Sequence, residues 1–103
     1  MDLSVELFGM KLEHPVMNAA GTGKLMKGPL SVPELARSAV SAITMGTYTP
    51  QQKDGNEGET FYNTNPLYAL NSLGLPNPGR EYLETYLRAM ADIAHAAGKK
   101  LVV

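Results

Sequence analysis

Residues 80–103, with the sequence REYLETYLRAMADIAHAAGKKLVV, contain the strongest structural signal in the chain. Apolar side chains recur at helical spacing, and most charged side chains lie on the opposite side. Gly98 is a suitable C-terminal stop, and the apolar run 101–103 has the composition of a buried strand. The sequence therefore predicts a helix over 80–97 followed by a strand. The apolar stripe of this helix consists of Leu83, Tyr86, Leu87, Met90, Ile93, Ala94 and Ala97.

The ten residues before this helix, LNSLGLPNPG at 70–79, combine two glycines and two prolines with hydroxyl and amide side chains. Gly and Pro impose unusual backbone angles, while Asn71 and Ser72 can direct hydrogen bonds at a planar polar molecule. The composition indicates a shaped binding loop. From these residues alone, a simple turn that leads into the helix is an equally good interpretation.

The stretch 47–70 has neither a helical nor a strand period and is rich in turn residues. Connections of this length are uncommon and are either functional or disordered. Four large apolar or aromatic residues favour an ordered loop at a functional site over disorder. They are Phe61, Tyr62, Leu67 and Tyr68.

The first part of the chain begins with two short alternating segments, which predict a β-hairpin over 4–13 with Gly9 and Met10 between its strands. Pro15 ends the pairing because it has no N–H for a ladder. The small, apolar run 16–21 then ends in a glycine. It is either a strand followed by a tight turn or a strand whose backbone another molecule can approach closely.

A second, shorter helix is expected after a loop over 22–30, which includes Pro29. Ser31 and Glu34 have the spacing of a capping box, with Pro33 in the first turn, and predict a helix over 32–38. In the segment 39–46, apolar and polar residues do not alternate. This pattern predicts a strand that is buried on both faces of a parallel sheet.

The order of these elements is hairpin, strand, helix, strand, long loop, helix and strand. Strands that alternate with helices indicate parallel βαβ units and the α/β class. Three such strands would leave apolar edges without partners. We therefore expect residues 1–103 to form the N-terminal portion of one larger α/β domain.

Composition excludes several classes of function. The 103 residues are 44% hydrophobic and 18% charged, as in soluble globular proteins, and a net charge of −1 gives no reason to expect nucleic acid or an anionic membrane as a partner. No cysteine is present, so disulfides and thiolate metal sites are excluded, and a cytoplasmic protein is expected. The first residues lack the basic and apolar regions of a signal peptide, and no run is long enough to cross a bilayer.

Three motifs, PVMNAAG at 15–21, KDGN at 53–56 and NSLGLPNPG at 71–79, resemble the class 1 dihydroorotate dehydrogenases in order and spacing. The resemblance extends from about Val5 to Val103. It implies the N-terminal part of a (β/α)₈ TIM barrel preceded by a hairpin, in a homodimeric FMN enzyme. Such enzymes oxidise dihydroorotate to orotate in pyrimidine biosynthesis. The electron acceptor, whether fumarate, NAD through a partner subunit or another oxidant, stays open.

The same resemblance assigns roles to residues of this chain. FMN contacts are implied for small or hydroxyl residues at two strand ends, namely Ala19, Ala20, Gly21, Gly46 and Thr47. Pyrimidine contacts are implied for Asn71, Ser72, Leu73, Gly74 and Leu75. An Asn side chain both donates and accepts hydrogen bonds, as the imide edge of a pyrimidine requires.

Two departures from the family pattern affect the expected activity. Met45 occupies the position of a family Lys and offers neither a cation nor a donor. The family's catalytic base corresponds to a position beyond Val103, and His14 and His95 are expected to be surface residues. We therefore expect no catalytic residue and no metal site in this chain, which alone should be inactive. A non-catalytic pyrimidine-binding relative and a flavin reductase for another substrate are the alternatives.

Overall fold

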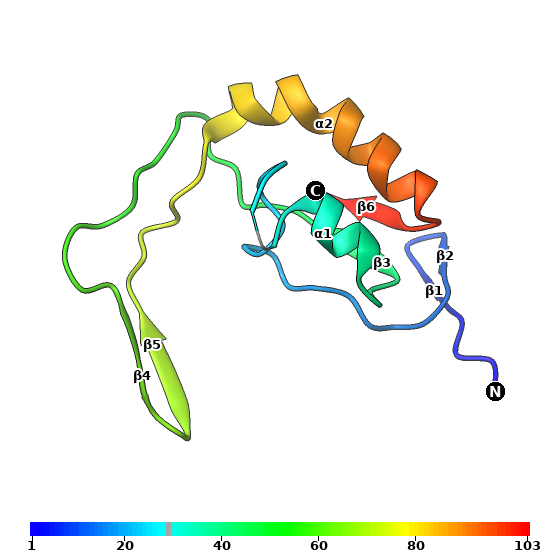
Figure 1. Ribbon diagram of the computed structural model, residues 1–103, viewed down its shortest axis with the longest axis horizontal. Coiled ribbons are helices and arrows are strands. Elements are labelled where there is room, and N and C mark those ends of the chain that lie inside the picture. The colour runs from blue at the N-terminus through cyan, green and yellow to red at the C-terminus, as the bar shows by residue number, and fades with distance from the viewer. Residues whose placement is uncertain (29) are drawn as a thin grey trace. The chain divides into compact units, whose positions relative to one another are not determined.

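A computed structural model describes residues 1–28 and 30–103 and leaves out only Pro29, so the predicted loop residue at this position lies outside the described residues. The chain divides into two compact units. One unit contains Met1–Thr47 and Glu84–Val103, and the other contains Tyr48–Leu83. The elements of both units are labelled in Figure 1.

The predicted N-terminal hairpin is confirmed, with strands β1 (Val5–Leu7) and β2 (Met10–Leu12) paired antiparallel. The turn between them differs from the prediction by one residue, because Met10 belongs to β2 and the turn consists of Phe8 and Gly9. Both turn residues have positive φ, 48° and 74°, as in the tight turns whose twist matches a hairpin.

A small parallel sheet lies at the centre of the first unit. Strand β3 (Ala42–Thr44) pairs with β6 (Lys100–Val102), and Ile43 lies opposite Leu101. On the other side of β3, Met17 forms a parallel bridge with Ala42. The predicted parallel arrangement is therefore confirmed, with segments in the spatial order Met17, β3, β6.

The predicted strands at 16–21 and 39–46 are longer than those observed. Beyond the Met17 bridge, the side chain of Asn18 forms the hydrogen bonds that a strand backbone would otherwise form. Its Oδ1 accepts from Thr44 N at 2.8 Å, and its Nδ2 donates to Thr44 O at 2.8 Å. A backbone ladder cannot use the same Thr44 groups. The strand therefore ends as soon as the side chain replaces the main chain.

The apolar core of the first unit surrounds β3. Ile43, Met90 and Val32 are its largest fully buried side chains, and Leu35 is also buried. Helix α1 (Val32–Arg37) has Ser31 as its N-cap, whose Oγ accepts from Glu34 N at 3.4 Å. The reciprocal half of the predicted capping box is absent from the described contacts, because the Glu34 carboxylate pairs with Arg37 instead.

Helix α2 (Gly79–Ala96) confirms the predicted long helix to within one residue at each end. Gly98, at φ +73°, ends it, with Lys99 N donating to Ala94 O at 2.9 Å. The predicted apolar stripe is only partly buried, however. Met90 and Ala94 are fully buried, whereas Tyr86 and Leu87 remain 38% and 39% exposed. No helix in the described ranges is long and apolar enough to cross a membrane.

The second unit contains a hairpin that the sequence did not reveal. Strands β4 (Phe61–Asn65) and β5 (Tyr68–Asn71) pair antiparallel within the stretch expected to be an irregular loop. The prediction was wrong because nearly all residues of this ribbon are exposed on both faces, so burial leaves no period of two. The backbone ladder and a contact between the Tyr62 and Tyr68 rings, 6.5 Å apart, stabilise it.

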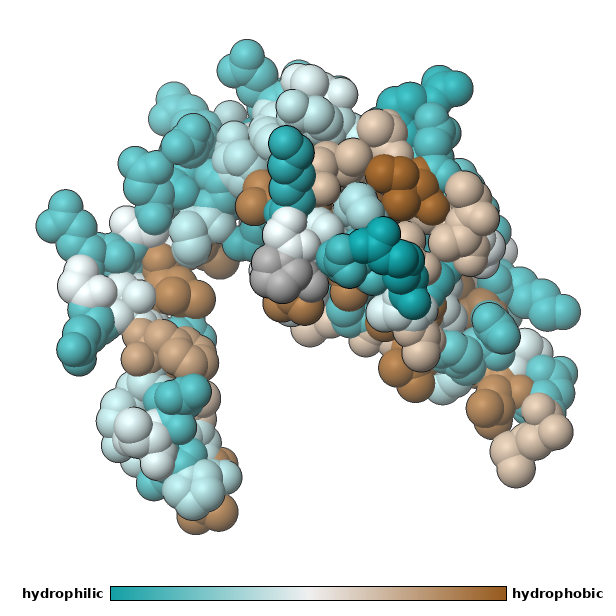
Figure 2. All heavy atoms as spheres, viewed as in Figure 1, coloured by the Kyte–Doolittle hydropathy of each residue, from teal (hydrophilic) through white to brown (hydrophobic). Residues whose placement is uncertain are grey.

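The same hairpin presents apolar side chains at its surface. Phe61, Leu67 and Leu70 are 57%, 89% and 61% exposed. Figure 2 shows apolar atoms beside polar ones on this part of the chain. The Tyr48–Leu83 unit therefore depends little on burial of apolar surface for its shape.

Candidate functional site

In the first unit, the ends of two neighbouring parallel segments bring together the residues predicted to contact a cofactor. Gly21 N donates to Gly46 O at 2.6 Å, which joins the turn after the first segment to the turn after β3. Asn18, which the sequence reading did not single out as a site residue, fastens the two segments one step earlier through both polar atoms of its side chain. The structure therefore brings Ala19–Gly21 close to Gly46 and Thr47.

The residues of these turns have short side chains. Ala19, Ala20, Gly21 and Thr47 are exposed, whereas Gly46 is buried. A Cβ placed on Gly21 would meet no atom within 4 Å, so the space in front of this backbone is open. The geometry allows a planar molecule to lie against main-chain atoms here.

Two residues next to these turns are enclosed by protein. A Cβ on Gly23 would lie 2.8 Å from Leu35 Cδ1 and 3.2 Å from Thr44 O, so a larger residue at that position would require the Leu35 side chain and its surroundings to shift. Met45 is only 3% exposed, and its N–H donates to Val102 O at 2.8 Å. The position for which the resemblance implies a family Lys therefore holds a buried thioether side chain.

In the second unit, the predicted pyrimidine-binding segment has a well-defined and unusual backbone. Gly74 and Leu75 both have positive φ, 75° and 54°. For Leu75 this left-handed conformation costs about 1–2 kcal/mol, so other contacts must stabilise it. Asn56 supplies two: its N–H donates to Leu73 O at 3.0 Å, and its Nδ2 donates to Ser72 O at 2.7 Å.

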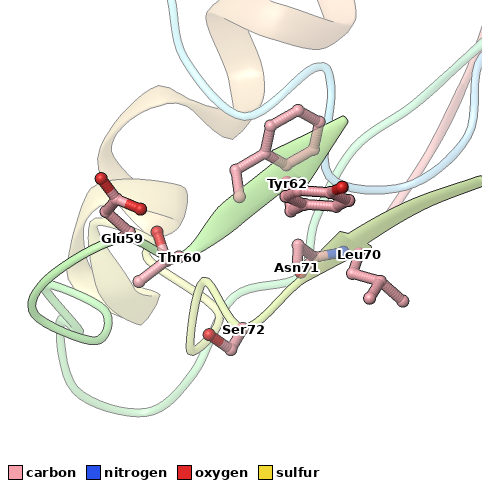
Figure 3. A pocket seen from close by; sticks show the side chains of 7 residues that line it. Glu59, Thr60, Tyr62, Leu70, Asn71 and Ser72 are labelled. Carbon is pink, nitrogen blue, oxygen red and sulfur yellow. The ribbon is translucent and has the colours of Figure 1, made fainter. Parts of the chain in front are cut away.

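The start of this segment lines a hollow of about 240 Å³ at the base of the β4–β5 hairpin. Asn71, Ser72 and Leu70 form one side, and residues 59–62 form the other (Figure 3). Among the described contacts, the Asn71 side chain has a single long one, 3.5 Å from its Oδ1 to Leu73 N, so its amide group keeps most of its hydrogen-bonding capacity. Leu73 and Leu75 are exposed, and Gly74 is half-buried.

Asn77 is a polar residue of this unit to which the sequence interpretation assigned no binding role. It is 6% exposed, and both of its backbone groups pair with Lys53, with N···O distances of 2.9 and 3.0 Å. Its side chain bonds to Thr49, Leu75 and Gly79. An Asn directly before Pro and Gly and just ahead of a helix is a signal for a side-chain-stabilised turn, and that signal could have identified it.

The second unit carries more acidic than basic residues. Asp54, Glu57, Glu59 and Glu81 are its acids, and Lys53 and Arg80 are its bases. Burial raises the pKa of Tyr48 to about 12, and the nearby Tyr82 acts in the same direction. Within residues 1–28 and 30–103, no group of three or more metal-binding side chains comes together.

Comparison with known proteins agrees with the three motifs. The family model described as dihydroorotate dehydrogenase matches residues 2–99 of this chain. The chain belongs to the dihydroorotate dehydrogenase family. The resemblance predicted from the sequence is thereby confirmed.

The similar members of the dihydroorotate dehydrogenase family are considerably longer than this chain. A probable dihydroorotate dehydrogenase A (fumarate) of Enterococcus faecalis is 41% identical over 86 residues, which are 84% of this chain and 27% of the relative. The dihydroorotate dehydrogenase (fumarate) of Kluyveromyces lactis is 38% identical over 87% of this chain and 28% of its own length. The chain therefore spans between a quarter and a third of these relatives.

A third relative belongs to another type within the dihydroorotate dehydrogenase family. It is the catalytic subunit of dihydroorotate dehydrogenase B (NAD(+)) of Thermoanaerobacter pseudethanolicus, 35% identical over 89% of this chain and 30% of the relative. Similarity to both types leaves the electron acceptor undetermined, as the sequence motifs did. The family assignment does not by itself test the roles of individual residues, which therefore stay predictions.

Proposed function

We propose that this chain is the N-terminal portion of an FMN-dependent enzyme that oxidises dihydroorotate to orotate. The observation that carries the proposal is the family match over residues 2–99. In the complete protein we expect this portion to form the hairpin and the first βα units of a (β/α)₈ barrel, whose chemistry lies at the carboxyl ends of its strands. The parallel order Met17, β3, β6 supports this arrangement.

The residues present fit the edge and face of a flavin ring. The small side chains of Ala19 and Ala20, the open space at Gly21 and the exposed Thr47 hydroxyl would allow the ring to lie against the backbone. When bound, FMN supplies the redox chemistry, and the protein supplies position and charge. Gly46 would contribute by holding Gly21 through its carbonyl.

The proposed role of the second unit is to orient the pyrimidine. The Asn71 amide would both donate to and accept from the imide edge, while Ser72 offers a hydroxyl group. The backbone N–H groups around Gly74 would hold the carboxylate, because glycine has no Cβ to obstruct its approach. Leu73 and Leu75 would cover the ring with apolar surface.

A matched pair of substitutions in the β4–β5 hairpin tests this role in the complete protein. We expect Asn71→Ala to weaken orotate binding about tenfold or more, because a hydrogen-bonding site left without its partner loses affinity. Asn63→Ala, on the neighbouring strand, should leave affinity unchanged. The measurement is titration of the protein's flavin absorbance with orotate. Equal affinities for the two variants would contradict the proposed role of Asn71.

Met45 is the observation that favours a second candidate, either a pyrimidine-binding relative without turnover or a flavin reductase for another substrate. Because Met45 is buried and uncharged, it cannot stabilise negative charge as a Lys would, an effect worth roughly 3 kcal/mol in a dry site. If the dehydrogenase site is merely weakened, Met45→Lys should raise turnover of dihydroorotate. No gain in a folded, FMN-containing variant would favour the second candidate.

The remaining properties of the proposed enzyme follow from the family resemblance. We propose a homodimer in the cytoplasm whose partner is a small-molecule substrate. Residues 1–103 purified alone should neither retain FMN nor reduce a dye with dihydroorotate. Retention of both properties by this polypeptide would show that the catalytic apparatus does not require further residues.

A further inference from the structure

The side chain of Asn77 has an acceptor half and a donor half, and both of them bond to Thr49. Its Oδ1 accepts from Thr49 N at 3.0 Å, from the Thr49 hydroxyl at 3.2 Å and from Gly79 N at 2.9 Å, which fixes the beginning of α2. Its Nδ2 donates to Leu75 O at 2.8 Å and to the Thr49 hydroxyl at 3.0 Å. Both halves therefore serve the scaffold, and within the described contacts the donor half alone reaches the predicted binding segment.

The bond to Leu75 occurs where the backbone most needs support. Leu75 is a non-glycine residue with positive φ, 54°, and it directly follows Gly74 at 75°. A hydrogen bond to the Leu75 carbonyl fixes the orientation of the next peptide plane and so opposes relaxation of Leu75 to negative φ. If Leu75 relaxed, the backbone groups of Gly74 and Leu75 would turn away from their present directions.

The scaffold around Asn77 is rigid enough to transmit this constraint. Its own backbone pairs with Lys53 in both directions, and its side chain is almost completely buried. A Cβ on Gly79 would lie 2.7 Å from Gln52 N, so the chain approaches itself closely on this side as well. The amide of Asn77 therefore has little freedom to rotate away from Leu75.

We infer that Asn77 is a positioning residue for pyrimidine binding, which holds the Asn71–Leu75 segment in its binding conformation through the hydrogen bond from Nδ2 to Leu75 O. The inference rests on the proposed function for the identity of the ligand. Asn77 itself is buried and acts through Leu75 rather than by touching the substrate.

The substitution Asn77→Asp separates the two halves, because a carboxylate keeps the acceptor and removes the donor. Asn65→Asp is the matched control: it adds the same charge in the same unit, and the Asn65 Oδ1 acts only as an acceptor in the described contacts, from Leu67 N at 2.8 Å. In the complete protein we expect Asn77→Asp to raise the KM for dihydroorotate and the Kd for orotate about tenfold, with kcat within about twofold. Asn65→Asp should leave all three near their original values.

Two results would overturn the inference. One is an Asn77→Asp variant with unchanged KM and Kd. The other is a loss of kcat and thermal stability with KM unchanged, which would indicate a purely structural role. Asn77→Ala, which removes both halves, should lower stability as well as affinity, and its affinity should be no better than that of Asn77→Asp.

A separate measurement distinguishes failure of the inference from failure of the proposed function. If the original protein binds no orotate, the proposed function is wrong, and amide hydrogen exchange over residues 71–75 then tests the positioning role directly. Faster exchange in Asn77→Asp but not in Asn65→Asp would support it. Equal exchange in both variants would overturn it.

Discussion

Ile43 and Asn77 are both nearly inaccessible to solvent, at 0% and 6% exposure, but they stabilise their surroundings in different ways. Ile43 lies in β3 among the apolar side chains of the first unit. Asn77 lies among backbone N–H and C=O groups of the second unit, where all large apolar side chains are at least partly exposed. One unit is organised by burial of apolar surface and the other by hydrogen bonds from amide side chains.

The two kinds of interaction differ in what they specify. Apolar packing is not directional, so the core around β3 specifies no direction for a polar group. Hydrogen bonds from Asn56 and Asn77 specify the direction of individual carbonyl groups in the predicted binding segment.

The largest expected effect comes from the apolar unit and tests the comparison directly. Ile43→Ala removes one of the largest fully buried side chains and should lower the free energy of unfolding by about 3 kcal/mol. Leu70→Ala, on the 61% exposed β5 position, should change it by less than about 0.5 kcal/mol. Urea denaturation of the two variants measures both free energies of unfolding. Similar losses in the two variants would contradict the claim that only the first unit is stabilised by burial of apolar side chains.

A smaller effect is expected for a pair of glycines within the second unit. Gly74 and Gly58 both have positive φ, 75° and 83°, so an alanine at either costs about 1 kcal/mol of backbone strain. At Gly74 the added Cβ would also lie 2.9 Å from Asn56 N and 2.7 Å from its Oδ1, whereas at Gly58 it meets nothing within 4 Å.

We therefore expect Gly74→Ala to cost about 2 kcal/mol and Gly58→Ala about 1 kcal/mol, a difference due to the contact with Asn56. Thermal unfolding gives the stability of each variant, and orotate titration gives the affinity. Affinity should fall for Gly74→Ala alone. If Gly58→Ala weakened orotate binding equally, backbone strain anywhere in the unit, rather than the Asn56 contact, would explain the loss.

Sequence-based prediction succeeded better for the first unit than for the second, because apolar side chains are buried in the first unit and largely exposed in the second. Burial of apolar residues leaves a helical period or an apolar run in the sequence. The helix at Gly79–Ala96 was therefore predicted with a shift of one residue, and the parallel strands were predicted with errors in their bounds. Strands β4 and β5 are exposed on both faces and leave no period. The predicted binding residues come from a motif. The support from Asn18 depends on a contact 26 residues away in sequence, which no local pattern encodes, whereas the Asn77 bond to Leu75 spans two residues and accompanies the local Asn-Pro-Gly signal.

The smallest expected effect is a loss of folding stability caused by the ionisation of Tyr48, which occurs above pH 10 and not at neutral pH. Burial raises the pKa of Tyr48 from 10.0 to about 12 in the folded chain, so the native state retains a proton that the unfolded state loses. Stability is therefore unaffected below pH 10 and falls as the pH rises from 10 towards 12. The slope of unfolding free energy against pH should be shallower in Tyr48→Phe than in the original protein. Identical slopes would show that Tyr48 titrates alike in both states.

The spatial order of the parallel segments, Met17, β3 and β6, is the same as their order along the chain. During synthesis on the ribosome, which proceeds from the N-terminus, each segment therefore emerges beside a neighbour that has already been made. β3 can add to the Met17 segment, and β6 can add to β3, without waiting for distant parts of the polypeptide. The sheet can thus assemble by successive addition, one strand at a time, while translation continues.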